Sequence, residues 1–562
     1  MIKISMFLFL DRFINQKSQK ISSAALIIAF FGLVSRFLGL WRDRLMAGQF
    51  GAGKTLDIYY AAFRIPDLVY NLLIIGAISS AFLPIFYEYS TKNKKEAWEF
   101  SANVLNILIF ALLIFSAFLI LFTPQLMFLV APGFDSASKA LATDVSRLLF
   151  LSPLLLGVSA LVTALLQAFS KFLIAALAPV FYNLGIILGI VFLAPHYGIW
   201  GLAFGVIIGA LVHLLIQIPS LLNIGFRFRG FFNFKDQGLV KMAKLWLPRT
   251  FGLFALQINS IVSTAVASIL ASGSITIFNF ADNLRWVPIG IVGVAFSTAA
   301  FPAMSLAYAQ GKRDLFSQRF SLAVRQALFI VAPLSVLFFI LRNQIVKIIL
   351  GAGNFNWQNV QLTAAILGLF AFGIFAASLL PLFTRAFFAF HNTKTPVFIN
   401  VFSMLINIVL SFIFVGLLIK FPFLSQKLGN IMGISNVGNI AILGLPLAVT
   451  VASIINIIWH WFDLKKCIGD FGVREIKKSC VKIIIATGAS AGFIYMVSIS
   501  NLGVLFQTFF AALVGGMVYL LVAFALGMEE ILMLNIPATL LNWRGIKNPE
   551  PELTGESLDD QF

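Results

Sequence analysis

Residues 98–130, WEFSANVLNILIFALLIFSAFLILFTPQLMFLV, form one apolar run in which Glu99 is the single charged side chain. The run is longer than the ~20 apolar residues that an α-helix needs to cross a ~30 Å hydrocarbon core. Inside a bilayer every backbone N–H and C=O must be paired internally, so spanning segments are helices or closed barrels. Barrel strands would be ~10 residues of strict alternation. This stretch therefore predicts a transmembrane helix.

The rest of the chain has the same character. Of its 562 residues, 60% are hydrophobic and 11% are charged, whereas soluble domains carry about 25% charged residues. The sequence predicts an all-α polytopic membrane protein with fourteen transmembrane helices. They are expected near residues 23–41, 58–87, 98–130, 145–169, 172–194, 199–222, 240–270, 274–306, 322–350, 361–390, 396–419, 438–462, 480–499 and 504–527.

The distribution of the 40 Lys and Arg residues predicts the orientation. Most lie at the termini and in the loops after even-numbered helices, which the positive-inside rule places in the cytoplasm. The net charge of +18 follows from this asymmetry, and no basic domain that would bind nucleic acid is present. Residues 1–22 lack a cleavage site and predict a cytoplasmic or interfacial segment before an uncleaved first helix. The polar tail at 544–562 is expected to be disordered and cytoplasmic.

The residue patterns argue against several catalytic or cofactor-binding interpretations. Gly48–Thr55 satisfies the P-loop pattern G-x-x-x-x-G-K-[ST], but a P-loop needs a buried strand before it, and here it lies in an outer loop between two membrane helices. We predict no ATP site and no cofactor. The two cysteines and four histidines show no metal-ligand spacing. No metal-binding D-x-D pattern occurs, so an enzyme is not expected.

Two short motifs recur at nearly one offset and predict an internal repeat. Residues 79–84 (SSAFLP) are echoed by 297–302 (STAAFP), 218 positions later, and 179–183 (PVFYN) by 396–400 (PVFIN), 217 positions later. A unit of six helices gives both copies the same orientation, and in such transporters the substrate binds between the copies. We predict lobes at 23–232 and 233–470, with helices 13 and 14, at 471–530, outside the repeat.

Charged residues inside apolar spans are the strongest functional signal, because they cost several kcal/mol and usually face a cavity or a partner. They concentrate in helices 1, 2, 7 and 8, which are equivalent pairs in the repeat. One interpretation is salt bridging within pairs such as Arg42/Asp43 and Asp282/Arg285. The other is a cationic cavity for an anionic substrate, because the planar fork of Arg pairs with phosphate and carboxylate. The predicted substrate-binding residues are Arg36, Arg42, Asp43, Asp57, Arg64, Arg249 and Arg285.

The opening segment resembles the MurJ/MviN family of lipid II flippases. It contains Ser35-Arg36-Phe37-Leu38-Gly39, Arg42-Asp43, Phe50-Gly51-Ala52-Gly53, Asp57, Ala62-Phe63-Arg64-Ile65-Pro66 and Ala81-Phe82-Leu83-Pro84. Pro248-Arg249, Gln257-Ile258-Asn259, Ala281-Asp282 and Arg385-Ala386-Phe387 continue the similarity, which covers about residues 23–470.

The resemblance implies the multidrug/oligosaccharidyl-lipid/polysaccharide exporter fold in the bacterial inner membrane. It implies a role in peptidoglycan synthesis: flipping the anionic undecaprenyl-pyrophosphate-linked precursor, lipid II, from the inner to the outer leaflet by alternating access. A cationic cavity between lobes would take the headgroup, and a groove involving the last two helices the lipid tail. We expect the protein to be a monomer that contacts membrane lipids. Peptidoglycan synthases are possible partners.

Two departures from the family pattern affect this picture. Tyr70 and Asn71 replace helix-2 arginines, and Asn283 stands where helix 8 usually has arginine, with Arg285 two residues on. Asn407 is followed by Ser411 rather than by Asp, so sodium is not predicted, although coupling to the membrane potential or another ion is open. The alternatives are a flippase for an O-antigen or capsule precursor, a drug exporter of the same fold, or a non-transporting scaffold for envelope synthesis.

Overall fold

The computed structural model describes residues 21–75, 82–434, 437–500 and 502–534. These residues form helices and connecting turns, with no strand among them, which confirms the all-α fold class. Eleven of the described helical segments are long and apolar enough to cross a membrane. The count of fourteen stays a prediction. The N-terminal segment up to residue 20 and the tail at 544–562 lie outside the described residues.

The contacts divide the chain into two compact units. The first comprises the chain up to Thr276 together with Ile349–Asn356, and the second comprises Ile277–Ile348 and everything after Asn356. The boundary differs from the predicted lobe boundary at 232/233, because the helix that follows it packs against the helices of the first unit. The lobes predicted from the repeat therefore stay a prediction.

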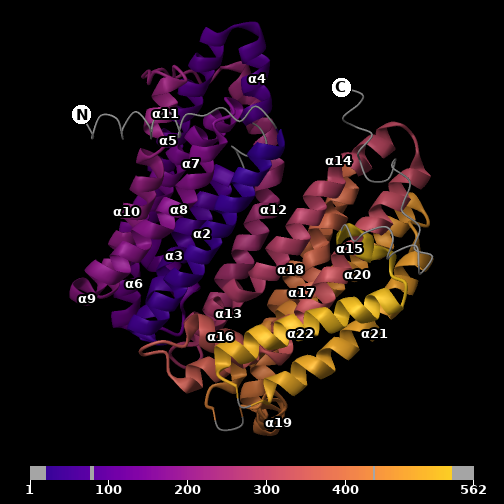
Figure 1. The fold of residues 1–562 in the computed structure, drawn as a ribbon. Coiled ribbons are helices and arrows are strands. Elements are labelled where there is room, and N and C mark those ends of the chain that lie inside the picture. The colour runs from indigo at the N-terminus through magenta and orange to yellow at the C-terminus, as the bar shows by residue number, and fades with distance from the viewer. Residues whose placement is uncertain (1–20, 76–81, 435–436, 501, 535–562) are drawn as a thin grey trace, which may run out of the picture. The chain divides into compact units, whose positions relative to one another are not determined.

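The first unit is built from helices that coil around one another without a sheet (Figure 1). They are α2 (Ile21–Phe50), α3 (Lys54–Val69), η1 (Tyr70–Ile75), α4 (Leu83–Lys92), α5 (Lys94–Val130), α6 (Ser136–Leu149), α7 (Leu151–Ala168), α8 (Phe172–Leu188), η3 (Gly189–Leu193), α9 (Ala194–Tyr197), α10 (Ile199–Leu215), α11 (Ile218–Asn223) and α12 (Gln237–Ser268). Helix α8 packs on both α2 and α10, and α3 packs on α5, α6 and α12.

Glycines bring α8 and α10 into backbone contact. A Cβ on Gly185 would lie 2.3 Å from the Cα of Gly209, and a Cβ on Gly189 would lie 2.3 Å from the Cα of Gly205. Glycines four residues apart on both helices make the small-xxx-small pattern that lets membrane helices approach closely. This close approach fixes the position of the polar side chains that α8 and α10 carry.

The second unit contains α13 from Ile277 onward and the helices that follow. They are α13 (Ser274–Pro288), η4 (Ile289–Val294), α14 (Ala295–Ala309), α15 (Arg313–Ile340), α16 (Arg342–Leu350), α17 (Trp357–Ala389), α18 (Lys394–Lys420), α19 (Pro422–Met432), η5 (Ile440–Leu443), α20 (Gly444–Ile468), α21 (Val473–Ser498), α22 (Val504–Ala525) and η6 (Glu529–Leu534). Buried aromatic residues from α15, α17 and the α20–α21 turn fill its core, including Phe320, Phe383, Phe387 and Phe471.

Helices α21 and α22 pair with each other, and α21 packs against α15 (Figure 1). Helix α22 also contacts α15, through Tyr519, whose hydroxyl donates a 2.7 Å hydrogen bond to the Phe329 carbonyl. Helix α19 was not predicted. It begins at a proline and ends before Gly433, whose φ is +74°, and it is too short and polar for a spanning pattern.

Among the described residues, wider π-turns interrupt three of the predicted spans: η1 follows α3, η3 follows α8 and η4 follows α13. Single π-turns inside helices are frequent at functional sites. The first and the last begin 219 residues apart, at Tyr70 and Ile289, and lie in the predicted spans 58–87 and 274–306, which the repeat treats as equivalent.

Candidate functional site

Arg42 and Asp43 form a part-buried ion pair in the C-terminal third of α2. The Arg42 Nη2 and Nε atoms lie 2.8 and 3.1 Å from the same Asp43 oxygen. The Asp43 side chain is 4% exposed, whereas the Arg42 side chain is 23% exposed. The arginine is thus held by its neighbour and keeps part of its guanidinium surface accessible.

Asn183 on α8 completes this cluster. Its Oδ1 accepts a 3.3 Å hydrogen bond from Arg42 Nη1, and its Nδ2 donates to the hydroxyl and carbonyl of Ser35 at 3.1 and 3.3 Å. Asn183 therefore links α8 to two turns of α2. Asn400, its counterpart in the repeated motif, accepts a 3.0 Å hydrogen bond from Asn456. The sequence shows the repeated motif but gives no sign of the contacts that Asn183 makes.

Asp57 lies inside the first turn of α3 and is 4% exposed. Its Oδ1 accepts hydrogen bonds from the backbone N–H and the hydroxyl of Thr276 at 2.8 and 2.7 Å. Its Oδ2 accepts one from the backbone N–H of Gly273 at 2.6 Å. A carboxylate at a helix N-terminus satisfies donors that have no partner within the helix and is favoured by the helix dipole. Asp57 is thus a cap for α13 supplied by another helix.

Arg64 lies two turns after Asp57 on α3. Its Nε donates a 2.7 Å hydrogen bond to the hydroxyl of Thr264 on α12. Tyr60, one turn before it, is within electrostatic reach of Arg64 and also of the Arg42–Asp43 pair. The structure therefore brings Arg42, Asp43 and Arg64 to one region of the first unit.

The remaining predicted residues are placed less closely. Arg36 is half-buried on α2, one and a half turns before Arg42. Arg249 lies in α12, but its side chain is outside the described part of the chain. Arg285, in the second unit, pairs with Asp282 at 2.6 Å, and its guanidinium lies 4.3 Å from the ring centre of Phe370. Both predicted ion pairs, Arg42/Asp43 and Asp282/Arg285, are thus formed in the structure.

The glycines of the P-loop-like segment serve close packing. Asn354 donates from its backbone N–H to the Gly48 carbonyl at 2.8 Å and from its side chain to the Gln49 carbonyl at 2.7 Å. A Cβ on Gly51, whose φ is +65°, would lie 2.7 Å from the Asn354 carbonyl oxygen. Residues 48–53 and 351–354 therefore form a tight loop pair in the first unit.

Next to this loop pair, Lys54 reaches Asp135, the residue that caps α6. Their charged atoms lie 3.1 Å apart, and both side chains are well exposed. Hydrogen bonds from Ser138 and then from Lys54 lower the pKa of Asp135 to about 2. The carboxylate therefore stays charged well into acid, which keeps the turn before α6 capped.

The first unit contains a cavity of about 260 Å³. Its walls come from α3, η1, α7, α8 and α10, and they carry a carboxylate, two phenols, a serine hydroxyl and an imidazole. The lining residues are Phe63, Pro66, Asp67, Tyr70, Ser152, Pro153, Leu156, Pro179, Tyr182 and His213.

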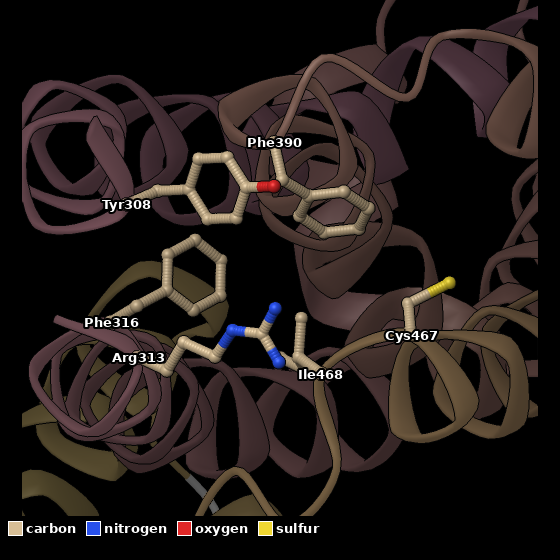
Figure 2. A pocket seen from close by; sticks show the side chains of 6 residues that line it. All are labelled: Tyr308, Arg313, Phe316, Phe390, Cys467 and Ile468. Atoms are coloured by element: carbon tan, nitrogen blue, oxygen red, sulfur yellow. The ribbon is translucent and has the colours of Figure 1, made fainter. Parts of the chain in front are cut away.

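A second cavity, in the second unit, holds about 50 Å³. Figure 2 shows the Arg313 guanidinium extending toward Ile468, with the rings of Phe316 and Tyr308 beside it. Small-molecule sites are usually ~300–1,000 Å³, so this cavity has room for a water molecule or two and no larger ligand.

A family model described as "Lipid II flippase MurJ" matches residues 46–516. A probable lipid II flippase MurJ of Buchnera aphidicola subsp. Acyrthosiphon pisum is 32% identical over 385 residues, which cover 68% of this chain and 75% of the relative. One from Thermotoga maritima is 30% identical over 501 residues, covering 88% and 95%.

Solved structures agree with the sequence matches. One described as "Lipid II flippase MurJ, inward closed conformation" superposes with a TM-score of 0.71 at 25% identity, covering 89% of this chain and 98% of that one. An inward-facing MATE family transporter of the MOP superfamily gives a TM-score of 0.57 at 14% identity, covering 79% and 98%. The second likeness concerns the fold alone.

Proposed function

Because this chain belongs to the lipid II flippase MurJ family, we propose that it moves lipid II from the inner to the outer leaflet of the bacterial cytoplasmic membrane by alternating access. Lipid II is a polyprenyl pyrophosphate that carries a sugar and a peptide, so its headgroup is anionic. A protein that accepts it from one leaflet needs cations in a membrane-embedded site, where they are expensive to keep.

The observation that carries this proposal is the way Arg42 is held. Asp43 and Asn183 fix the guanidinium from two sides while part of it remains accessible. An orientated, partly desolvated guanidinium is suited to bidentate contact with a phosphate or carboxylate. Asp43 lowers the cost of keeping this charge in the membrane.

The other predicted residues take related roles in the proposal. Arg36, Arg64 and Arg249 bind the pyrophosphate or the peptide carboxylates, and Asp57 holds the start of α13. Arg285 is a weaker candidate, because its side chain is less exposed than that of Arg42, 16% against 23%, and its guanidinium lies 4.3 Å from the Phe370 ring as well as beside Asp282. Contact with phosphate would have to compete with both partners.

The energy source, orientation and partners belong to the same proposal. Both termini are cytoplasmic, as the distribution of Lys and Arg predicts, and the protein acts as a monomer that peptidoglycan synthases can contact. Net movement is biased by the membrane potential, worth ~2.3 kcal/mol per charge per 100 mV, or by an ion. No ATP hydrolysis is invoked.

Complementation tests the proposal. Bacteria depleted of their own lipid II flippase are given the wild-type chain, Arg42→Ala, Arg42→Lys or Arg147→Ala, with membrane levels measured for each. Arg147 is a matched control, because it also pairs with a nearby aspartate but is 43% exposed on α6. We expect rescue by the wild type and Arg147→Ala, weak rescue by Arg42→Lys and none by Arg42→Ala.

The other outcomes separate the alternatives. A well-expressed wild type that does not rescue growth would redirect the proposal to another polyprenyl-linked oligosaccharide or to drug export. Rescue by Arg42→Ala at the wild-type level would leave the substrate standing and remove Arg42 from the binding site. Rescue by a chain that shows no lipid II movement in vesicles would favour a scaffold.

A further inference from the structure

The cavity inside the first unit has polar walls within a membrane-embedded bundle. Its volume is about 260 Å³, and each water molecule in liquid occupies ~30 Å³, so several waters or a hydrated ion fit. Asp67, Tyr70, Ser152 and Tyr182 bring oxygen atoms to the lining from four different elements. Genuinely empty cavities are apolar, whereas polar walls are typical of cavities that hold water or another polar occupant.

Asp67 is the charged member of this lining. Its backbone carbonyl accepts a 2.8 Å hydrogen bond from Asn71, whereas its carboxylate receives no hydrogen bond or salt bridge from the part of the chain that the structure describes. An ionisable side chain inside a membrane is costly and is normally paired or placed on an ion pathway. Asp67 therefore borders the cavity without a bonded partner for its carboxylate among the described residues.

The nearby arginines do not occupy that space. Arg64, one turn before Asp67, acts on it electrostatically, but its Nε is bound to Thr264 on α12 and it is not among the lining residues. Arg42 is not among the lining residues either and is held by Asp43 and Asn183. His213 is the one lining residue with a basic ring, and its Nδ1 is 2.6 Å from the Ser159 hydroxyl.

The ligand set points to a singly charged hard cation. Carboxylate, hydroxyl and water oxygens suit hard ions, and one carboxylate balances one positive charge. Among the described residues no group of three or more His, Cys, Asp or Glu side chains could hold a metal ion together, which disfavours a divalent ion. The lining also contains three prolines, Pro66, Pro153 and Pro179. None of them has a backbone N–H to donate.

We propose that this cavity binds one hydrated alkali cation, Na⁺ or K⁺, with Asp67 as its charged ligand and the hydroxyls of Tyr70, Ser152 and Tyr182 around it. The bound ion compensates the Asp67 charge and links α3 with α7 and α8. The site lies within one unit of the chain, so binding does not depend on lipid II movement and is measured separately from it.

The test uses the purified full-length chain in detergent. Thermal unfolding midpoints are measured against NaCl, KCl and choline chloride at fixed ionic strength, and binding is measured directly with ²²Na⁺ in competition with unlabelled Na⁺ and K⁺. The variants are Asp67→Asn, Tyr182→Phe and the control Asp144→Asn, which changes an exposed carboxylate on α6.

We expect saturable binding of one ion and a midpoint that rises with Na⁺ or K⁺ but not with choline. Asp67→Asn should weaken binding at least tenfold, Tyr182→Phe severalfold, and Asp144→Asn not at all. Equal midpoints in all three salts without ²²Na⁺ binding would overturn the proposal, as would unchanged binding in Asp67→Asn. Stabilisation that follows pH and ignores the salt would mean that Asp67 takes a proton, which also overturns it.

If Asp67→Asn does not fold, Tyr182→Phe still tests the ion site, because this substitution removes one hydroxyl and little volume. Failure of this test leaves lipid II flipping untouched, since complementation measures that function in the cell. Failure of complementation with intact ion binding would remove the proposed substrate and leave the ion site standing.

Discussion

The carboxylate of Asp57 caps α13 by accepting hydrogen bonds from Thr276, at 2.8 Å from its backbone N–H and 2.7 Å from its hydroxyl. The two residues are 219 positions apart in the sequence. The cap therefore makes the first turn of α13 depend on the first turn of α3. A change at either residue should affect both the stability of the first unit and any motion that begins at α13.

Asp57→Asn should lower both the stability of the first unit and the rate of lipid II movement. An amide keeps one acceptor but turns a donor toward Gly273 or Thr276, and it lacks the charge that the helix N-terminus favours. Hydrogen bonds to charged groups contribute about 1.5–3 kcal/mol each, so we expect a loss of about 2 kcal/mol or more in unfolding free energy and at least tenfold slower lipid II movement.

Thr276→Val is the matched variant, because it removes one of the three hydrogen bonds and keeps the shape of the side chain. Thr276→Val should lower the unfolding free energy by about 1.5 kcal/mol, the low end for a hydrogen bond to a charged group, and should keep most of the activity. Detergent-solubilised unfolding and a vesicle flipping assay measure the two quantities. An Asp57→Asn protein with wild-type stability and activity would contradict the capping role.

Asn183→Ala tests whether Asn183 positions Arg42. The substitution removes the hydrogen bonds to Arg42 and to Ser35, so complementation should weaken while the charge of Arg42 remains. If Asn183 acts through Arg42, the double variant Arg42→Ala/Asn183→Ala should be no worse than Arg42→Ala alone. Additive losses of activity would show an independent role for Asn183, and Asn456→Ala, which alters the equivalent asparagine pair, controls for general destabilisation.

Most of the fold followed from hydropathy, and the errors have physical causes. The span expected at 145–169 begins at Ser136 instead, because α6 opens with a polar, amphipathic stretch capped by Asp135. Short apolar runs mark the middle of a membrane helix but not its ends, where polar caps extend the helix into water. Helix α19 was missed because it is too short and polar to show a spanning pattern.

The sequence drew attention to individual candidate residues but not to the contacts that they make. Apolar surroundings made Arg42 and Asp57 conspicuous, and adjacency suggested the Arg42–Asp43 pair. The partners Asn183, Thr264 and Thr276 are ordinary polar residues within apolar helices, and their contacts join positions 141, 200 and 219 residues apart. One sequence carries no signal for such pairings, so they required the folded chain.

The Lys54–Asp135 contact predicts an acid response. The pKa of Asp135 is lowered to about 2 in the folded chain, compared with ~3.9 for an unperturbed aspartate. A lowered pKa stabilises the fold above ~pH 4 and the contribution is lost as the pH falls toward 2. The unfolding midpoint of Asp135→Asn should therefore decline less between pH 4 and pH 2 than that of the wild type.

Lys54→Met should give an intermediate slope, because it removes the second of the two hydrogen-bond partners that lower the Asp135 pKa and leaves Ser138. Parallel slopes in all three proteins would show that this carboxylate does not contribute to acid stability. Because both side chains are well exposed, the effect should shrink at high salt.

Gly353→Ala should loosen the loop pair formed by residues 48–53 and 351–354. A Cβ there would lie 2.2 Å from the Gly48 carbonyl oxygen, and the φ of +49° already disfavours any side chain. Gly433 has a φ of +74° with open space around its Cβ position, so Gly433→Ala carries the backbone cost of about 1–2 kcal/mol without the clash.

We expect Gly353→Ala to unfold more easily than Gly433→Ala by a further 1–3 kcal/mol, the usual cost of overpacking. The difference between the two variants isolates the close approach from the left-handed backbone conformation that they share. Equal destabilisation would mean that the loop pair yields to the added methyl group, and the glycines of the P-loop-like pattern would then be required only for their backbone angles. A larger loss for Gly353→Ala, with cysteines at 49 and 354 cross-linking readily in the wild-type background, would establish the contact between the two loops in the membrane.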